Sequence, residues 1–318
     1  MLTYNIITIS LVFGFGRGIQ VERTIQQYQK AFNTIIDRLK SNEAVLAVMV
    51  FGSMVTGDLW EESDIDLFVI LEKKMADIKN IYTEEKNIPV HIKLMSKNKF
   101  IQLYEEDLRG GFMHRMFASS RLVFSKDMDI TIKYDSGRYY PDLDRERWNM
   151  VYLGKVLKSV DVCNKYLSND GVYTAYGAAV KCLENYAKLY VNSAGYMISK
   201  DAMKMAMNLN ADFKECVDNL FFNNKDTEKT LGKTVEYLEK SIDDNIRNTA
   251  SILINYMRDK DCFLSTEDIK NDNLFVNYDI AMEDILNRLW ERNIIKRDSR
   301  DYKSDDGKLL FKENVYFI

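Results

Sequence analysis

The stretch FGSMVTGDLWEESDID, residues 51–66, decides the fold of the first part of this chain. It connects two apolar runs, with a Gly-Ser pair after the first run and two aspartates, Asp64 and Asp66, at the start of the second. In a β-strand alternate residues lie on the same face, so the two carboxylates share one face and Ile65 lies on the other. Two carboxylates at this spacing repel each other unless a cation lies between them.

A divalent cation with oxygen ligands suits this pair of acids. Mg²⁺ prefers carboxylate oxygens and keeps coordination positions for phosphate oxygens. Gly52 lets the backbone approach a ligand closely, and the Ser53 hydroxyl with the amides that follow can hold a phosphate. We therefore predict a site for a metal-bound nucleoside triphosphate, with Mg²⁺ or Mn²⁺ on Asp64 and Asp66. The alternative is a pair of solvated acids at a strand edge, after an ordinary turn.

Strands and short helices alternate around this stretch, which predicts a compact α/β domain over residues 21–130. Helices are expected where apolar residues recur at helical spacing, and strands where short apolar runs are rich in valine and isoleucine. The expected helices cover 21–40, 75–86 and 97–119, the last broken near Gly110-Gly111, and the expected strands end at Phe51 or cover 64–71, 88–95 and 121–127.

The strand signal then disappears for more than a hundred residues. Residues 134–144 are expected to form a loop, and the apolar pattern afterwards is helical. Helices are predicted over 144–167, 172–194, 200–222 and 227–258, with Gly195 ending the second of them. This pattern predicts an antiparallel helical bundle over 142–258.

The segment 260–318 has a third pattern, which resembles a winged helix. A capping signal at Ser265 or Thr266 begins one helix, residues 277–293 form another, and two strands flank the polar loop 300–307. Residues 261–318 carry nine Lys and Arg residues against thirteen Asp and Glu residues, which does not favour DNA binding. A local basic patch is still conceivable from five residues, Arg288, Arg292, Lys296, Arg297 and Arg300.

The overall composition is that of an ordinary globular protein. The 318 residues carry a net charge of −4, which argues against general affinity for nucleic acid or for an anionic membrane. The four cysteines are widely spaced and predict free thiols in a reducing cytoplasm. Residues 5–13 are apolar but too short to span a bilayer. We hypothesise that the natural chain begins at Val21, from a GTG start codon.

The Gly-Ser pair, the spacer and the Asp-apolar-Asp sequence together resemble the signature of the DNA polymerase β-like nucleotidyltransferase superfamily. The residues that fit it are Phe51, Gly52, Ser53, Asp64, Ile65, Asp66 and Leu67. The order of transferase core, helical bundle and winged-helix-like end looks like a family of bacterial nucleotidyltransferase-like proteins, in which the bundle is a substrate-binding-type domain. The resemblance implies an α+β protein whose α/β core has a mixed sheet, followed by the bundle and the small C-terminal domain.

The resemblance also implies a reaction. Minimal members transfer a nucleoside monophosphate from a triphosphate to a hydroxyl and release pyrophosphate, with the first two acids holding the metals. A third acid on a later strand helps to deprotonate the hydroxyl. The matching position here is His91, and no Asp or Glu lies between Lys86 and Tyr104. His91 could be a neutral base, could mark a site that kept binding and lost catalysis, or could be structural.

Two further residues, Glu184 and His114, have side chains that can act in acid–base chemistry. Glu184, in the second predicted helix of the bundle, is one candidate for a replacement base, because relatives that modify aminoglycosides use a carboxylate from outside the core triad; the alternative is an exposed helix charge. His114 follows Gly-Gly-Phe-Met on a helix and is not expected to be catalytic.

Three functions are compatible with these observations. The first is an enzyme that uses Mg²⁺ to transfer a nucleotidyl group from a nucleoside triphosphate to a hydroxyl of an unknown acceptor, a small molecule or a protein. The second is a catalytically eroded nucleotide-binding regulator whose winged-helix-like end contacts DNA or a protein partner. The third is an antitoxin-like module, which the long single chain disfavours. None of the three requires a membrane.

Overall fold

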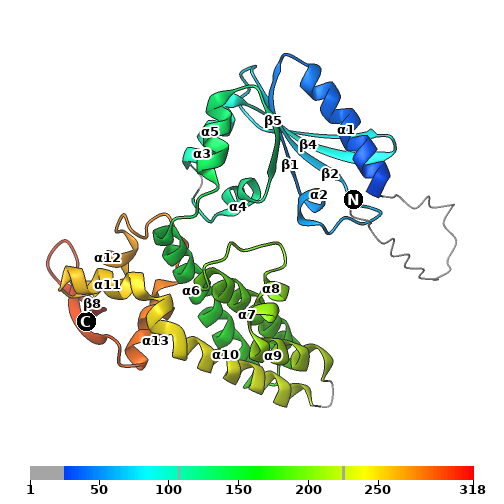
Figure 1. Ribbon diagram of the computed structural model, residues 1–318. Helices are drawn as coiled ribbons and strands as arrows, with labels where there is room; N and C mark the ends of the chain where they lie inside the picture. The colour runs from blue at the N-terminus through cyan, green and yellow to red at the C-terminus, as the bar shows by residue number, and fades with distance from the viewer. Residues whose placement is uncertain (1–24, 107, 224–225) are drawn as a thin grey trace. The chain divides into compact units, whose positions relative to one another are not determined.

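The computed structural model describes residues 25–106, 108–223 and 226–318. The chain divides into two compact units (Figure 1). The first comprises the residues up to 103 together with 119–134, and the second comprises 104–118 with 135–318. The hypothesis of a start at Val21 lies outside the described residues. None of the described helices is long and apolar enough to cross a membrane.

A five-stranded sheet forms the centre of the first unit. Its strand order is β3-β4-β2-β1-β5. The strands β2 and β4 are parallel and all other neighbours are antiparallel, which confirms the predicted mixed sheet. The strands are β1 (Val45–Phe51), β2 (Ile65–Leu71), β3 (Lys79–Glu85), β4 (Ile88–Ser96) and β5 (Arg121–Ser125).

The two faces of this sheet have different neighbours. Helix α1 (Ile25–Ser41) covers one face, where Tyr28 and Ile35 pack with Val48, Leu67 and Val90. Figure 1 shows α3 (Lys97–Glu106) and α5 (Met128–Gly137) on the other side of the sheet. Because side chains alternate along a strand, Asp66 of β2 projects from the face that α1 leaves free.

One predicted helix, over residues 75–86, is wrong. Residues 79–85 form the edge strand β3, which pairs with β4 along its whole length. Lys86 and Asn87 both have positive φ, 52° and 63°, as the two-residue turn of a tight hairpin requires. This turn folds β3 back onto β4, and the pairing outweighs the helical spacing of the apolar residues.

The loop predicted over 134–144 is also wrong in part. Helix α5 reaches Gly137, and α6 (Asp142–Leu167) begins directly after Pro141. The Asp127 carboxylate accepts a hydrogen bond of 3.1 Å from the backbone N–H of Ile130, which is the arrangement of an N-terminal cap. This cap begins α5 immediately after β5, so only residues 138–141 connect the two helices.

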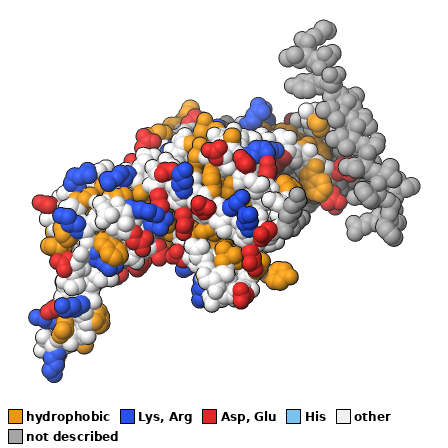
Figure 2. All heavy atoms as spheres, turned by 90° about the horizontal axis from the view of Figure 1, so that it is seen from below, with side chains coloured by type: hydrophobic (Ala, Val, Ile, Leu, Met, Phe, Trp, Pro, Cys, Tyr) orange, Lys and Arg blue, Asp and Glu red, His pale blue; other side chains and the backbone are white. Residues whose placement is uncertain are grey.

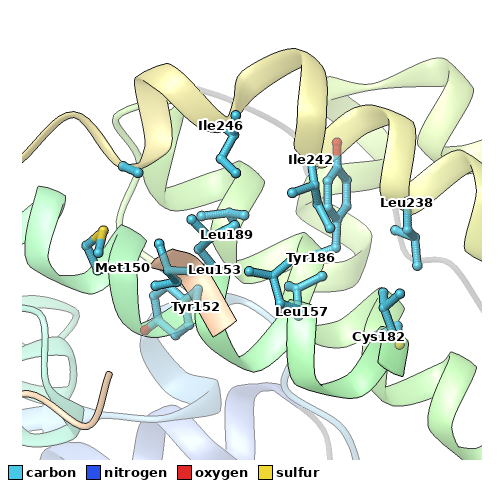
Figure 3. Packing of buried hydrophobic residues seen from close by; sticks show 14 of the residues in the cluster. Met150, Tyr152, Leu153, Leu157, Cys182, Tyr186, Leu189, Leu238, Ile242 and Ile246 are labelled. Carbon is cyan, nitrogen blue, oxygen red and sulfur yellow. The ribbon is translucent and has the colours of Figure 1, made fainter. Parts of the chain in front are cut away.

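Helices make up most of the second unit, as the sequence predicts for residues 142–258. Figure 3 shows Leu153 and Leu157 of α6 beside Tyr186 of α7 and Ile242 of α10, in one apolar core. Gly195, with φ of 90°, ends α7 as expected. The remaining helices of this part are α4 (Phe112–Ala118), α7 (Val172–Ser193), α8 (Ala202–Leu209), α9 (Ala211–Phe222), α10 (Thr227–Thr249) and α11 (Ser251–Lys260).

The C-terminal segment contains the expected two helices and two strands. Leu264, Ile285 and Leu289 belong to the same core as α6, α7 and α10, so this segment and the helices share one interior. The predicted boundaries 21–130, 142–258 and 260–318, and the winged-helix-like character of the last, stay predictions. The elements are β6 (Leu264–Ser265), α12 (Thr266–Lys270), α13 (Met282–Glu291), β7 (Lys296–Lys303) and β8 (Leu309–Phe317).

The strand β7 is longer than predicted. It extends to Lys303, so the polar loop predicted over 300–307 is reduced to 304–308. The Tyr302 and Phe311 rings stack across β7 and β8 at 4.8 Å between their centroids. Such a cross-strand aromatic pair stabilises the hairpin near its turn.

The arginines of the predicted basic patch mostly have acidic partners. Arg288 donates two hydrogen bonds to Asp243, of 2.8 and 2.9 Å, and Arg292 pairs with the same carboxylate. Arg300 pairs with Asp268 and Glu313 at 2.8 and 2.9 Å. Figure 2 shows basic and acidic side chains intermixed on the face that it displays. Cations that are paired in this way attract phosphate less than a free basic face does.

Asp243 links α10 to α13, and its removal is expected to destabilise the second unit. Asp243→Ala leaves two guanidinium groups without their carboxylate, and the side chains of Asp243 and Arg288 are each only 17% exposed. We expect the free energy of unfolding to fall by about 2–3 kcal/mol. Urea unfolding measures it, with Asp244→Ala, an exposed neighbour, as the control. An equal loss in both variants would contradict the role of the pair.

Asp268 gives the C-terminal segment a pH-dependent contribution. Burial alone would raise the pKa of Asp268, but hydrogen bonds with Ser265 and with Arg300 outweigh burial and lower the pKa below its usual value. A lowered folded-state pKa stabilises the protein above the unfolded-state pKa, and that stabilisation is lost as pH falls through the folded-state value.

We therefore expect Asp268→Asn to destabilise the protein at pH 7 by at most about 1 kcal/mol, since the side chain is 38% exposed. The difference from the wild type shrinks as pH falls below about 4. Urea unfolding at pH 7, 5 and 3 measures this difference, with Glu267→Gln as the charge-matched control. A difference as large at pH 3 as at pH 7 would exclude this carboxylate as its source.

Candidate functional site

The Gly-Ser turn lies against the second aspartate. Phe51, the last residue of β1, pairs with Asp66 on β2, and Gly52 follows with φ of 72° and ψ of −152°. Helix α2 (Ser53–Thr56), a single helical turn, then begins. A Cβ atom on residue 52 would overlap the Oδ2 atom of Asp66. The backbone here approaches the carboxylate so closely that only glycine fits.

His91 lies directly beside Asp66. The parallel pairing of β2 and β4 places the two residues opposite each other, and the imidazole Nδ1 is 3.4 Å from Asp66 Oδ1. The side chains of His91 and Asp66 are 19% and 23% exposed, so both can be reached from solvent. The structure thus brings His91 to the position at which the resemblance expects a third acid.

Asp66, His91 and Tyr82 lie side by side on β2, β4 and β3 and form one row across the sheet. The place of Tyr82 in this row was not predicted from the sequence. Tyr82 pairs with His91 across β3 and β4, and the two rings stack at 4.5 Å with an angle of 9° between their planes. The tyrosine is 75% exposed, so its other face is open. Tyr82 lies in the segment predicted as a helix, and the turn at Lys86-Asn87 is the sequence signal for the hairpin that brings it beside His91.

Asp64 is the most exposed of the residues expected to bind the metal and the triphosphate. The strand β2 begins at Ile65, one residue later than predicted, and Asp64 is exposed just before it. The backbone just before Asp64 is nevertheless held in place, because the Tyr28 hydroxyl of α1 donates a 2.7 Å hydrogen bond to the carbonyl of Ser63. Helix α1 therefore holds the entry of β2 while the carboxylate stays accessible.

The protein alone offers few ligands for a divalent ion, so the phosphates of a bound nucleotide and waters would have to supply the others. Within the described ranges, no group of three or more His, Cys, Asp or Glu residues converges as a metal site. Mg²⁺ and similar ions are commonly bound by one or two carboxylates, with waters and substrate phosphates filling the other positions. Asp64, Asp66 and the close-lying Gly52 backbone suit a cation that arrives with a triphosphate.

The two other residues considered for acid–base roles lie in the second unit. Glu184 is on α7 and is exposed. His114 is buried, its Nδ1 accepts a 2.9 Å hydrogen bond from the backbone N–H of Gly110, and its Nε2 lies 3.1 Å from the carbonyl of Tyr139. Both ring nitrogens of His114 are therefore committed to holding the local backbone, as expected of a structural histidine.

The second unit also contains a cavity that the sequence did not reveal. It has a volume of about 700 Å³ and lies among α7, α9 and α10. Tyr186, Tyr190 and Tyr237 contribute aromatic surface, and charged side chains of both signs, such as Lys233 and Asp244, line it. Burial raises the pKa of Tyr186, so its hydroxyl stays protonated and can donate hydrogen bonds. A cavity of this size can hold a small molecule.

A mixed sheet with Gly-Ser after one strand and Asp-x-Asp at the start of its neighbour defines a nucleotidyltransferase-like domain. Residues 33–164 match the family model described as "Polymerase beta, Nucleotidyltransferase". This part of the chain is a nucleotidyltransferase domain of the polymerase β-like superfamily.

The comparison with solved structures agrees on the fold. The chain is similar to the crystal structure of a nucleotidyltransferase-like protein from Exiguobacterium sibiricum, with a TM-score of 0.62 at 14% sequence identity. The similarity covers 91% of this chain and 99% of the other. The likeness in fold therefore extends beyond residues 33–164 to most of the protein. A search of curated proteins found no match.

Proposed function

We propose that this protein is a metal-dependent nucleotidyltransferase that transfers a nucleoside monophosphate from a nucleoside triphosphate to a hydroxyl group and releases pyrophosphate. The observation that carries the proposal is the close approach of Gly52 to the Asp66 carboxylate, whose Oδ2 atom a Cβ on residue 52 would overlap. It supports the proposal because the turn that would bind the phosphates and the acid that would bind the metal lie close enough to hold one ligand. Neither feature alone would distinguish this site from an ordinary turn or an exposed acid.

In this proposal each site residue has a physical role. Ser53 and the Gly52 backbone hold the triphosphate, and Asp64 and Asp66 bind Mg²⁺ or Mn²⁺. When bound, the divalent ion neutralises phosphate charge and activates the attacking hydroxyl. His91 supplies an imidazole at the third position.

The acceptor in the proposal is a small molecule held by the helical part, or a protein. The cavity of about 700 Å³ supports a small molecule, because its tyrosines offer flat apolar faces and its charged and amide side chains offer donors and acceptors. We place the protein in the cytoplasm, which suits its four free cysteines.

The test is direct. The purified full chain is incubated with each labelled nucleoside triphosphate, Mg²⁺ or Mn²⁺, and candidate hydroxyl acceptors, and both pyrophosphate and labelled product are measured. Release that depends on an acceptor and disappears in the Asp64→Asn/Asp66→Asn double variant supports transfer. Pyrophosphate release that survives in the double variant would exclude this site.

A second candidate function is a nucleotide-binding regulator without turnover, whose C-terminal segment contacts DNA or a protein. The observation that favours it is the imidazole of His91 in place of the third carboxylate. Binding of metal and nucleotide without pyrophosphate release, with acceptors supplied, would support this candidate. The acid-paired arginines of the C-terminal segment favour a protein partner over DNA.

A further inference from the structure

We propose that the outer edge of β7 pairs with the same edge of a second copy of this chain, so that the two small C-terminal sheets join into one sheet across a twofold axis. The strand β7 lies at one end of its sheet, whose order is β6-β8-β7. The proposal concerns self-association and does not depend on the proposed transfer reaction.

The free edge of β7 is long and accessible. All eight of its residues are exposed, and none of them is proline or glycine, the residues that interrupt strand pairing. Within the part of the chain that the structure describes, β7 pairs only with β8. An edge of this kind is a template for another strand unless its side chains oppose the pairing.

The charges on β7 favour pairing of the strand with itself. From Arg297 to Asp301 the sequence reads RDSRD. When two copies run antiparallel with Ser299 opposite Ser299, Arg297 lies opposite Asp301 of the second copy and Asp298 lies opposite Arg300. The twofold axis repeats both pairs. Opposite charges directly across an antiparallel pair stabilise it.

The same charges exclude the neighbouring registers. A slip by one residue in one direction places Asp298 opposite Asp301 of the second copy. A slip in the other direction places Arg297 opposite Arg300. Like charges directly opposite each other destabilise a strand pair, so one register is selected.

The charged groups are available for these pairs. Among the described residues Asp301 forms no ion pair, and Asp298 only accepts a 2.8 Å hydrogen bond from the next backbone N–H. Arg300 binds two acids of its own chain but is 45% exposed, and its guanidinium has five N–H donors. Arg297 lies over the ring of Trp290, which holds its side chain in place.

Pairing in this register also covers aromatic surface. Lys296 comes to lie opposite Tyr302 of the second copy, whose residue is 48% exposed. The ammonium of Lys296 is already 5.5 Å from the centre of the Phe317 ring. In the dimer this cation would therefore lie between two aromatic rings, an arrangement that favours association.

A cysteine at the twofold axis tests the register directly. Ser299→Cys is made together with Cys262→Ser, which removes the only exposed one of the four cysteines. In the proposed dimer the two Cα atoms at position 299 lie about 4.5–5.5 Å apart, within disulfide range. Mild oxidation of the full chain is expected to give a linked dimer. Asp301→Cys in the same background is the control, because its two copies lie about 14 Å apart along the strands.

Sedimentation equilibrium of the full chain measures the strength of the dimer. A dissociation constant of about 1–100 µM is expected for an interface of this size. Asp301→Arg places like charges opposite Arg297 twice in each dimer and is expected to raise that constant at least about tenfold. Adding Arg297→Asp exchanges the charges of these pairs and is expected to restore the dimer. Asp305→Arg, the same change in the turn beyond the strand, is expected to have no effect.

Three outcomes overturn the proposal. The first is a wild-type chain that stays monomeric up to about 500 µM. The second is an equal dissociation constant in Asp301→Arg and Asp305→Arg. The third is cross-linking through Asp301→Cys as efficient as through Ser299→Cys. Comparison of the two single arginine variants is decisive even if Arg297→Asp fails to fold, and none of these results bears on the proposed function.

Discussion

Asp66→Asn is expected to lower the rate of nucleotidyl transfer by about 10³-fold in a protein that still folds. The carboxylate lies between Gly52 and His91, so in the proposed function its charge would hold the ion nearest the phosphates. A lost metal ligand removes several kcal/mol of charge stabilisation, and about 1.4 kcal/mol corresponds to a factor of ten in rate. Pyrophosphate release at varied triphosphate concentration gives kcat/KM for both proteins.

The matched control for this variant is Asp37→Asn. It makes the same chemical change at an exposed position on α1, on the opposite side of the sheet. We expect its kcat/KM and its unfolding midpoint to equal those of the wild type. Transfer by Asp66→Asn within about tenfold of the wild-type rate would contradict the assignment of this acid as a metal ligand.

Gly52→Ala is expected to abolish triphosphate binding and to destabilise the first unit. Alanine disfavours φ of 72° with ψ of −152°, which costs about 1–3 kcal/mol, and its Cβ displaces the Asp66 carboxylate. A displaced Asp66 carboxylate would weaken metal binding, and a displaced backbone at residue 52 would weaken binding of the phosphates. Titration with a fluorescent triphosphate analogue and urea unfolding measure the two effects separately.

Gly57→Ala provides the control at the other end of α2. Gly57 also has positive φ, 82°, but nothing lies within 4 Å of the position of its Cβ. We expect a loss of about 1 kcal/mol from the backbone alone, with triphosphate binding retained. If both variants bound the triphosphate equally well, the close approach of Gly52 to Asp66 would have no part in the site.

Some of the site follows from local sequence. Three features can be seen within a few residues of each position. They are the glycine before a one-turn helix, the alternation of a strand across its two faces, and the lack of an acid close to His91 along the chain. The strands other than β3 and the helices that follow were predicted for the same reason, whereas the mixed character of the sheet was implied only by the resemblance. Their apolar periodicity is strong and their ends carry recognisable signals, such as Gly195 after α7 and Ser265 before α12.

Other features could not be predicted because they depend on pairing between distant segments. The sequence alone determined which residues are candidates to bind a metal and a phosphate, through the spacing of Gly52, Asp64 and Asp66. Only the tertiary structure decided that Tyr82 stacks on His91 and that His91 faces Asp66. The pairing of β2 with β4 sets the second contact, and its register follows from packing of the opposite face against α1. The pairing of β3 with β4 sets the first, and its register follows from the two-residue turn at Lys86 and Asn87.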